Sequence, residues 1–171
     1  MKTVILMRHA KSAWDSPELA DIDRPVAPRG IAAGEKMAAW LKKHMLNPQL
    51  IMCSTARRAR DTLELIRPAL PKTVKTRLMQ ELYMALPREL LTCLAKAPGG
   101  LDEVMVIGHN PGLHDFASWV IGTGEKKAVS DLRKKFPTAA IAVITFDTPN
   151  WSSLDGEAGT LKTFVTPKAL A

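Results

Sequence analysis

The feature that most constrains this chain is an apolar run near its start that ends at an Arg-His pair. Val4-Ile5-Leu6-Met7 is followed directly by Arg8 and His9, where the hydrophobicity stops. A continuous apolar run is typical of a strand covered on both faces, as in a parallel sheet. Open α/β sheets bind ligands just beyond the carboxyl ends of their strands. Arg8 and His9 are therefore predicted to lie at a functional site.

Length and composition indicate an ordinary globular protein. The 171 residues, 46% of them hydrophobic, suffice for one domain with a full core, so we expect a single domain over 1–171. No apolar run approaches the roughly 20 residues of a membrane span, and no signal-peptide pattern opens the chain. We expect a cytoplasmic monomer without membrane contact, with Cys53 and Cys93 reduced.

The net charge of +7 is compatible with nucleic acid, an acidic partner or an anionic substrate. Lys126-Lys127 and Arg133-Lys134-Lys135 are short basic runs without interleaved aromatic residues, so they indicate solvated faces. No nucleic-acid partner is expected, although salt-sensitive binding to random duplexes would support one. Lys11, Lys126 and Lys127 could instead attract an acidic phosphoprotein.

Apolar runs alternate with amphipathic helical segments. Residues 12–30 are predicted to form a loop over the first strand. Further strands are predicted at 50–53, 74–79, 103–109, 139–146 and 160–165, and helices at 29–45, 56–70, 87–94, 111–120 and 129–136. This order predicts an α/β fold, a three-layer α/β/α sandwich with a mostly parallel central sheet and one antiparallel C-terminal hairpin.

Residues at the predicted helix starts indicate an anion site. Ser54 and Asn110 are predicted N-caps, with Pro111 as the first residue of its helix. Arg57, Arg58 and Arg60 stand near a helix start, where the dipole disfavours cations, and a bound anion is the simplest reason. The alternative is that two or all three point into solvent.

Three strand ends converge if the sheet is open. They carry Arg8-His9, Ser54 with Arg58, and Gly108-His109. Two arginines and two histidines at one edge suit phosphate, because guanidinium groups bind it with paired hydrogen bonds. A neutral histidine there could attack phosphorus in line, so phosphoryl transfer through a covalent intermediate is the predicted chemistry.

The residues resemble a known family over most of the chain. The motifs are Arg8-His9, Ser54-x-x-x-Arg58-Ala59-x-x-Thr62 and Val106-Ile107-Gly108-His109-Asn110. From residue 4 to about residue 120 they resemble the histidine phosphatase (phosphoglycerate mutase-like) superfamily. Arg8-His9-Ala10-Lys11-Ser12-x-Trp14, with Asp23-Arg24-Pro25-Val26, is similar to its SixA-type phosphohistidine phosphatase branch, whereas mutases more often carry Gly after the histidine.

This resemblance implies roles for the site residues. His9 would be the nucleophile, and Arg8, Arg58 and His109 would bind the phosphoryl group. Arg24 would extend the phosphate pocket or contact substrate, and Asn110 would offer its backbone N–H. No metal or other cofactor is implied, because arginines supply the positive charge.

The proton donor is left open by the sequence. Larger members of the family use an acidic residue after the third strand, where Glu81 stands here. Asp15, Asp21 and Asp23 are alternatives in the loop, and Glu81 could equally be a solvated carboxylate. A phosphohistidine substrate needs no strong acid, since its leaving nitrogen can be protonated before the bond breaks.

The expected substrate is phosphohistidine in a protein, because the short chain leaves little room for specificity walls. A small phosphomonoester substrate and a non-catalytic phospho-ligand binding module are the alternatives. A metal site formed by His9, His109 and His114 is a further rival, which the absence of close-spaced Cys/His pairs disfavours.

Overall fold

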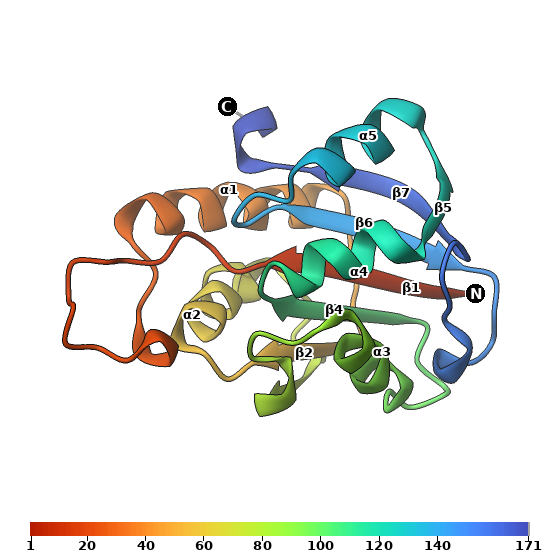
Figure 1. The fold of residues 1–171 in the computed structure, drawn as a ribbon, viewed down its shortest axis with the longest axis horizontal. Helices are drawn as coiled ribbons and strands as arrows, with labels where there is room; N and C mark the ends of the chain where they lie inside the picture. The colour runs from red at the N-terminus through yellow and green to blue at the C-terminus, as the bar shows by residue number, and fades with distance from the viewer. Residues whose placement is uncertain (171) are drawn as a thin grey trace.

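A computed structural model describes residues 1–170, in which seven strands form one sheet in the order β3-β2-β4-β1-β6-β7-β5 (Figure 1). The strands are β1 (Lys2–Arg8), β2 (Leu50–Ser54), β3 (Lys75–Met79), β4 (Glu103–Gly108), β5 (Ile121–Gly124), β6 (Ile141–Phe146) and β7 (Gly159–Val165). The α-helices are α1 (Pro28–Lys43), α2 (Arg57–Ile66), α3 (Pro87–Ala95), α4 (Gly112–Val120) and α5 (Lys126–Lys134). None of these helices is long and apolar enough to cross a membrane.

The sheet is mostly parallel, as predicted. β1 pairs in parallel with β4, and β2 lies in parallel between β4 and β3. β6 runs antiparallel to both β1 and β7, so β6 and β7 form the predicted C-terminal hairpin. The α/β fold class is thereby confirmed.

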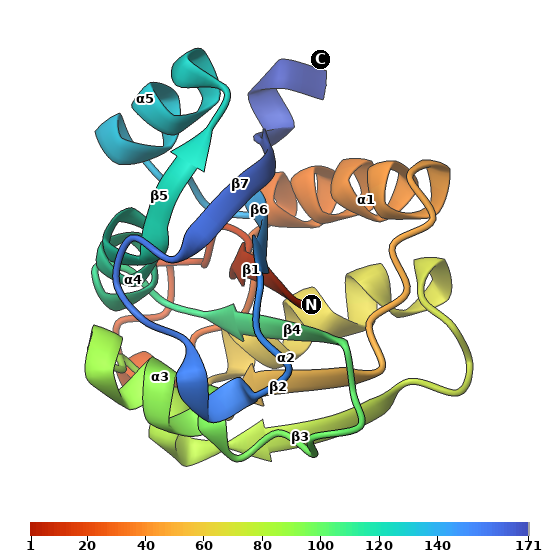
Figure 2. The same cartoon turned by 90° about the vertical axis from the view of Figure 1, so that its right-hand side faces the viewer.

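Helices cover both faces of the sheet because the central strand is apolar on both sides. Val4 and Leu6 belong to a core shared with α3, α4 and α5. Ile5 and Met7 point to the opposite face and belong to a core shared with α1 and α2. Figure 2 shows the sheet between these two helical layers. All four side chains are fully buried, which explains the unbroken apolar run.

Two boundaries near the end of the sheet differ from the prediction. The sequence predicts no strand between the helices at 111–120 and 129–136, but Gly122-Thr123-Gly124 belongs to β5, which pairs in parallel with β7. The next helix, α5, begins at Lys126 rather than at residue 129. The Glu125 side chain causes the earlier start, since it accepts hydrogen bonds from the backbone of Lys127 and Ala128 at 3.0 and 2.8 Å.

The two predicted N-caps are wrong. α2 begins at Arg57 after Ala56, and Ser54 is the last residue of β2, where its Oγ accepts from the Ala56 backbone N–H at 3.2 Å. α4 begins at Gly112, so Pro111 is not its first residue. The side chain of Asn110 donates instead to the Phe136 carbonyl at 2.9 Å. Asn110 thus bonds across the fold, and Ser54 bonds to the backbone two residues further on, so neither side chain caps a helix as predicted.

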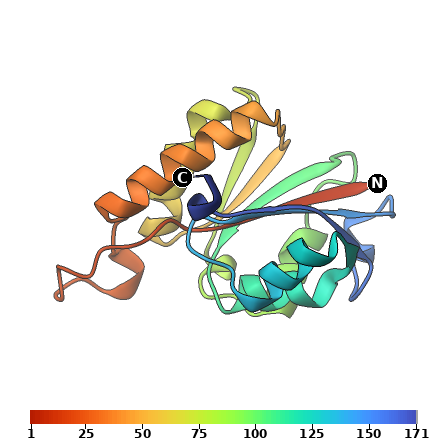
Figure 3. The same ribbon diagram turned by 90° about the horizontal axis from the view of Figure 1, so that it is seen from above.

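The segment between β1 and α1 is closed at its base by backbone hydrogen bonds. Ala13 N–H donates to the Pro25 carbonyl, and Ala27 N–H donates to the Lys11 carbonyl, both at 2.8 Å. Between these points the chain projects beyond the sheet and contains a short 3₁₀ turn at Asp21–Asp23 (Figure 3). The predicted 12–30 loop therefore has an ordered base and ends where α1 begins.

Candidate active site

The neighbouring strands β1, β2 and β4 deliver the predicted residues to one edge of the sheet. Arg8 ends β1 opposite Gly108, which ends β4, so His9 and His109 follow side by side. Their ring centroids lie 5.2 Å apart. Arg58 enters from the first turn of α2 and is buried, as are both histidines. The four residues Arg8, His9, Arg58 and His109 are thus brought together.

His9 is held with one ring nitrogen available for reaction. Its Nδ1 lies 2.8 Å from the Ala10 carbonyl oxygen, which only accepts, so Nδ1 carries the proton and Nε2 keeps its lone pair. Burial lowers the pKa of His9 to about 4, with Arg58 and Arg8 adding to the effect. The imidazole is therefore neutral at neutral pH, as a nucleophile must be.

In His109 it is the other ring nitrogen, Nε2, that is hydrogen-bonded, and its partner is Ser54. Its Nε2 lies 2.7 Å from Ser54 Oγ, and that oxygen already accepts from the Ala56 N–H. Ser54 Oγ can donate its hydroxyl proton to Nε2, and the proton of His109 then lies on Nδ1, which is buried without a partner within residues 1–170. Burial, and then the nearby His9, lower the pKa of His109 to about 3. A neutral ring with a buried N–H suits donation to an oxyanion.

The two arginines retain donors for an anion. Arg8 Nη1 donates to the Phe136 carbonyl at 3.2 Å, and Arg58 donates from Nη1 and Nη2 to Asp21 at 2.8 and 3.0 Å. The Nε atoms of Arg8 and Arg58 are buried without a partner within residues 1–170. Burial and the charge of Arg58 lower the pKa of Arg8. A phosphoryl group would satisfy these donors and relieve the repulsion between the two cations.

Thr62 ties the nucleophile segment to the helix that carries Arg58. Its buried hydroxyl accepts from the Ala10 N–H at 2.8 Å and donates to the Arg58 carbonyl at 2.7 Å. Ala10 in turn accepts the proton of His9 Nδ1. One side chain therefore sets the positions of both His9 and Arg58.

Asp21 is an acidic residue whose importance to the site the sequence does not reveal. Its carboxylate accepts from Arg58, from Arg24 at 2.9 Å and from the Tyr83 hydroxyl. These bonds, that of Tyr83 foremost, hold the pKa of the Asp21 carboxyl well below its usual range. The ring of Tyr83 also meets His109 edge-on at 5.4 Å. Asp21 was one of three loop carboxylates and Tyr83 followed no pattern, so only the folded chain distinguishes them.

Arg24 reaches the site through Asp21 rather than directly. Its nitrogens donate to Asp21, to Ser12 Oγ at 2.7 Å and to the Ala13 carbonyl at 3.2 Å. Its guanidinium carbon also lies 3.5 Å from the centroid of Trp14. Arg24 thus holds the 12–27 loop in place, with four of its five N–H groups already hydrogen-bonded.

Glu81 lies apart from the phosphate-facing atoms, whereas Asn110 lies beside Arg8. Glu81 is exposed and pairs with Lys96 at 3.8 Å. Asn110 directs its amide to the Phe136 carbonyl, the same oxygen that Arg8 contacts. The structure therefore places Asn110 beside Arg8 and leaves Glu81 on the outer surface.

The remaining candidates lie outside the cluster. Arg57 is half-exposed near Asp61, and Arg60 donates to the Thr55 carbonyl, so Arg58 alone of the three arginines faces the site. His114 contacts the Leu132 carbonyl at 2.7 Å and is not assembled with His9 and His109. Within residues 1–170, no three His, Cys, Asp or Glu side chains are grouped to hold a metal ion.

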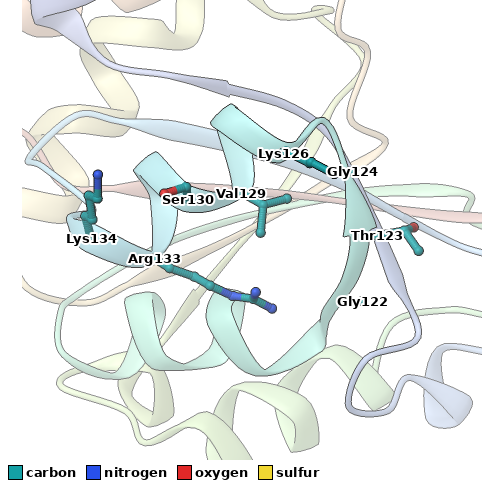
Figure 4. Close-up of a pocket in the computed structure, with 8 residues that line it drawn as sticks. All are labelled: Gly122, Thr123, Gly124, Lys126, Val129, Ser130, Arg133 and Lys134. Atoms are coloured by element: carbon teal, nitrogen blue, oxygen red, sulfur yellow. The ribbon is translucent and has the colours of Figure 1, made fainter.

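A separate groove of about 560 Å³ lies between β5 and α5. Its lining carries three basic side chains, Lys126, Arg133 and Lys134, and no histidine or acid. Figure 4 shows Arg133 extending from α5 towards β5, where it donates to the Ile121 carbonyl at 3.0 Å. The groove contains none of the predicted site residues.

Comparison with known proteins agrees with this site. A family model described as the histidine phosphatase superfamily (branch 1) matches residues 4–84. A solved structure from Agrobacterium tumefaciens, provisionally assigned as the phosphohistidine phosphatase SixA, is 30% identical, covers 97% of this chain and 98% of its own, and has a TM-score of 0.82. The chain belongs to the histidine phosphatase superfamily, and it is accordingly a phosphatase, a hydrolase.

Two further relatives define the branch. Phosphohistidine phosphatase SixA of Escherichia coli is 29% identical over 155 residues, which cover 86% of this chain and 91% of that protein. The structure of the protein histidine phosphatase SixA complexed with tungstate is 25% identical, covers 99% of both chains and has a TM-score of 0.76. Within the superfamily, this chain belongs to the SixA-type branch.

Proposed function

We propose that this phosphatase removes phosphoryl groups from phosphohistidine in proteins through a covalent intermediate on His9. The observation that carries the proposal is the Nδ1 contact of His9 with the Ala10 carbonyl, which leaves a neutral Nε2 beside two arginines. A relative of the same branch binds tungstate, an oxyanion with the shape of phosphate. The cytoplasmic, monomeric state expected from the sequence remains a prediction.

In the first step, His9 Nε2 attacks phosphorus and the bond to the leaving nitrogen breaks, so the substrate imidazole departs with a proton gained before cleavage. Arg8 and Arg58 neutralise the phosphoryl oxygens, and His109 Nδ1–H donates to one of them. In the second step, water attacks phosphorus and the Nε2–P bond breaks. Phosphate leaves as H2PO4− with both protons of the water, and Nε2 keeps the electron pair of the broken bond, so His9 is neutral again.

The acidic residues favour phosphohistidine over a phosphoester. Asp21 is held ionised by Tyr83, Arg24 and Arg58, which makes it a poor proton donor. Glu81 would have to leave Lys96 to act as the donor, and it stays our candidate only for an ester leaving group. A phosphoramidate nitrogen is protonated before the bond breaks, so it needs neither carboxylate.

A comparison of His9→Ala with wild type tests the proposal. The variant should release no phosphate from a phosphohistidine peptide, free phosphohistidine or an aryl phosphate, while still binding tungstate in a calorimetric titration. His44→Ala is the control, since His44 contacts the Trp40 carbonyl far from the cluster. Hydrolysis that continues in His9→Ala would disprove the mechanism. A wild type that binds tungstate but hydrolyses nothing would support a phospho-ligand binding module instead.

The same substrates, extended by sugar phosphates, identify the preferred class. Among these compounds the phosphohistidine peptide should give the highest kcat/KM in wild type. A clear preference for sugar phosphates would favour the alternative, a small-molecule phosphomonoester phosphatase.

A further inference from the structure

A second groove, of about 470 Å³, lies beside the active site and is strongly basic. Five of its eleven lining residues are cationic and none is acidic. The cationic residues come from distant parts of the chain, namely Lys11, Arg29, Lys36, Lys135 and Lys168. We call this surface the basic groove.

The basic groove and the phosphate-binding residues share a wall. The segment after α5 carries Lys135 into the groove, and the carbonyl of the next residue, Phe136, accepts from Arg8. Ala139 N–H, at the end of this segment, is 3.1 Å from the carbonyls of both Arg8 and His9. Lys11 follows His9 by two residues. A ligand that fills the groove therefore lies next to the phosphoryl group.

The five cations have no anionic partner within residues 1–170. Elsewhere in residues 1–170, Lys2, Lys96 and Lys127 each form an ion pair, but none of the groove cations does. All five are exposed, so their mutual repulsion is screened by solvent but not cancelled. An acidic ligand would supply the missing charge.

We propose that the basic groove binds an acidic segment of the phosphoprotein substrate while its phosphohistidine occupies the active site. This inference rests on the proposed function and names the partner class. The groove is lined between its cations by small side chains such as Ala32, Ala33 and Pro137, which leave room for a peptide backbone. It contains no aromatic residue on which bases could stack, so a protein segment fits better than single-stranded nucleic acid.

The separate groove between β5 and α5 is a weaker candidate for binding the acidic segment. Arg133 there is already bonded to the Ile121 carbonyl, and no contact joins that groove to His9 or Arg58. Lys127, beside it, pairs with Asp131 at 2.6 Å. Lys126 and Lys134 form no ion pair within residues 1–170, as in the basic groove, so it is the wall shared with the phosphate-binding residues that singles out the basic groove.

Charge reversal on α1 tests the proposal. Arg29→Glu with Lys36→Glu removes two groove cations, and an acidic residue in the first helical turn agrees with the helix dipole. Lys42→Glu with Lys43→Glu is the matched control, because these residues are exposed on the same helix, change the net charge equally and lie outside the groove. Two phosphohistidine peptides serve as probes, one flanked by Asp and Glu and one by Asn and Gln.

At low ionic strength, wild type should hydrolyse the acidic peptide with a kcat/KM about tenfold above that of the neutral peptide. The groove variant should lose this preference, the control variant should keep it, and free phosphohistidine should be hydrolysed equally by all three. Equal kcat/KM values for both peptides in wild type, with phosphohistidine still hydrolysed, would overturn the proposal that the basic groove binds an acidic segment. The proposed function would remain intact.

If no phosphohistidine compound is hydrolysed, a binding measurement still tests the basic groove. The fluorescence anisotropy of a labelled, unphosphorylated acidic peptide should rise with wild type and the control variant but not with the groove variant. No binding by wild type would overturn the proposal. Tighter binding of random duplex DNA than of the peptide, lost in the same variant, would overturn the assignment to a protein partner.

Discussion

Thr62 shows how one buried hydroxyl supports the reactive geometry. It accepts a hydrogen bond from the Ala10 N–H and donates one to the Arg58 carbonyl. Thr62→Val keeps the shape but leaves the Ala10 N–H buried without its acceptor, whereas the Arg58 carbonyl keeps its bond within α2, so we expect a loss of about 1–3 kcal/mol in the free energy of unfolding. kcat should also fall, because His9 and Arg58 lose their common support.

Urea denaturation and steady-state kinetics measure these effects. Thr62→Ser, which keeps the hydroxyl, is the control and should retain most of the activity. Wild-type stability and kcat in Thr62→Val would show that the two hydrogen bonds are dispensable.

The two buried histidines predict that stability depends on pH. Their pKa values, about 4 for His9 and about 3 for His109, lie below the ordinary 6.5. Between the folded pKa of about 4 and the ordinary pKa of 6.5, the histidines bind more protons in the unfolded chain than in the folded one. The free energy of unfolding therefore decreases as the pH falls from 6.5 towards 4. The urea midpoint of wild type should fall over this range, and that of His109→Gln should fall less. A midpoint independent of pH would contradict the buried neutral state.

At the level of elements, the first turn of α1 is pressed against the segment that follows His9. A Cβ on Gly30 would lie 2.3 Å from the Lys11 carbonyl and 2.6 Å from Val26 Cγ1. Gly30→Ala should therefore destabilise the protein by about 1–3 kcal/mol, the usual cost of overpacking. It should also lower kcat, since α1 and Lys11 cannot both keep their places.

Thermal unfolding of Gly30→Ala and of a control measures this effect. Gly99→Ala is the control, because nothing lies within 4 Å of its added Cβ. Equal melting temperatures for the two variants would contradict the tight contact between α1 and the segment after His9.

The elements that the sequence predicts well are those with a local signal. The apolar runs at β1, β2, β4 and β6 mark buried strands by their own composition. β5 has four residues, two of them glycine, and becomes a strand through its pairing with β7, which no local pattern encodes. The caps at Ser54 and Asn110 failed for the same reason, since tertiary contacts captured both side chains.

At the scale of the whole molecule, the predicted site depends on strand order. Arg8, His9 and His109 could be foreseen because they follow buried strands, and parallel neighbours end at one edge. Asp21 and Tyr83 could not, because they lie in loops whose paths are set by distant contacts. The sheet positions the reactive groups, and the loops supply their surroundings.

The measurement that tests the central claim most directly is the capture of the phosphorylated enzyme. Wild type is mixed with a phosphohistidine peptide, quenched in alkali, where phosphohistidine survives, and analysed by intact-protein mass and peptide mapping. We predict one transient phosphoryl group on the peptide that contains His9, absent from His9→Ala. Rapid phosphate release with no label on the enzyme, or a label on another residue, would contradict the account.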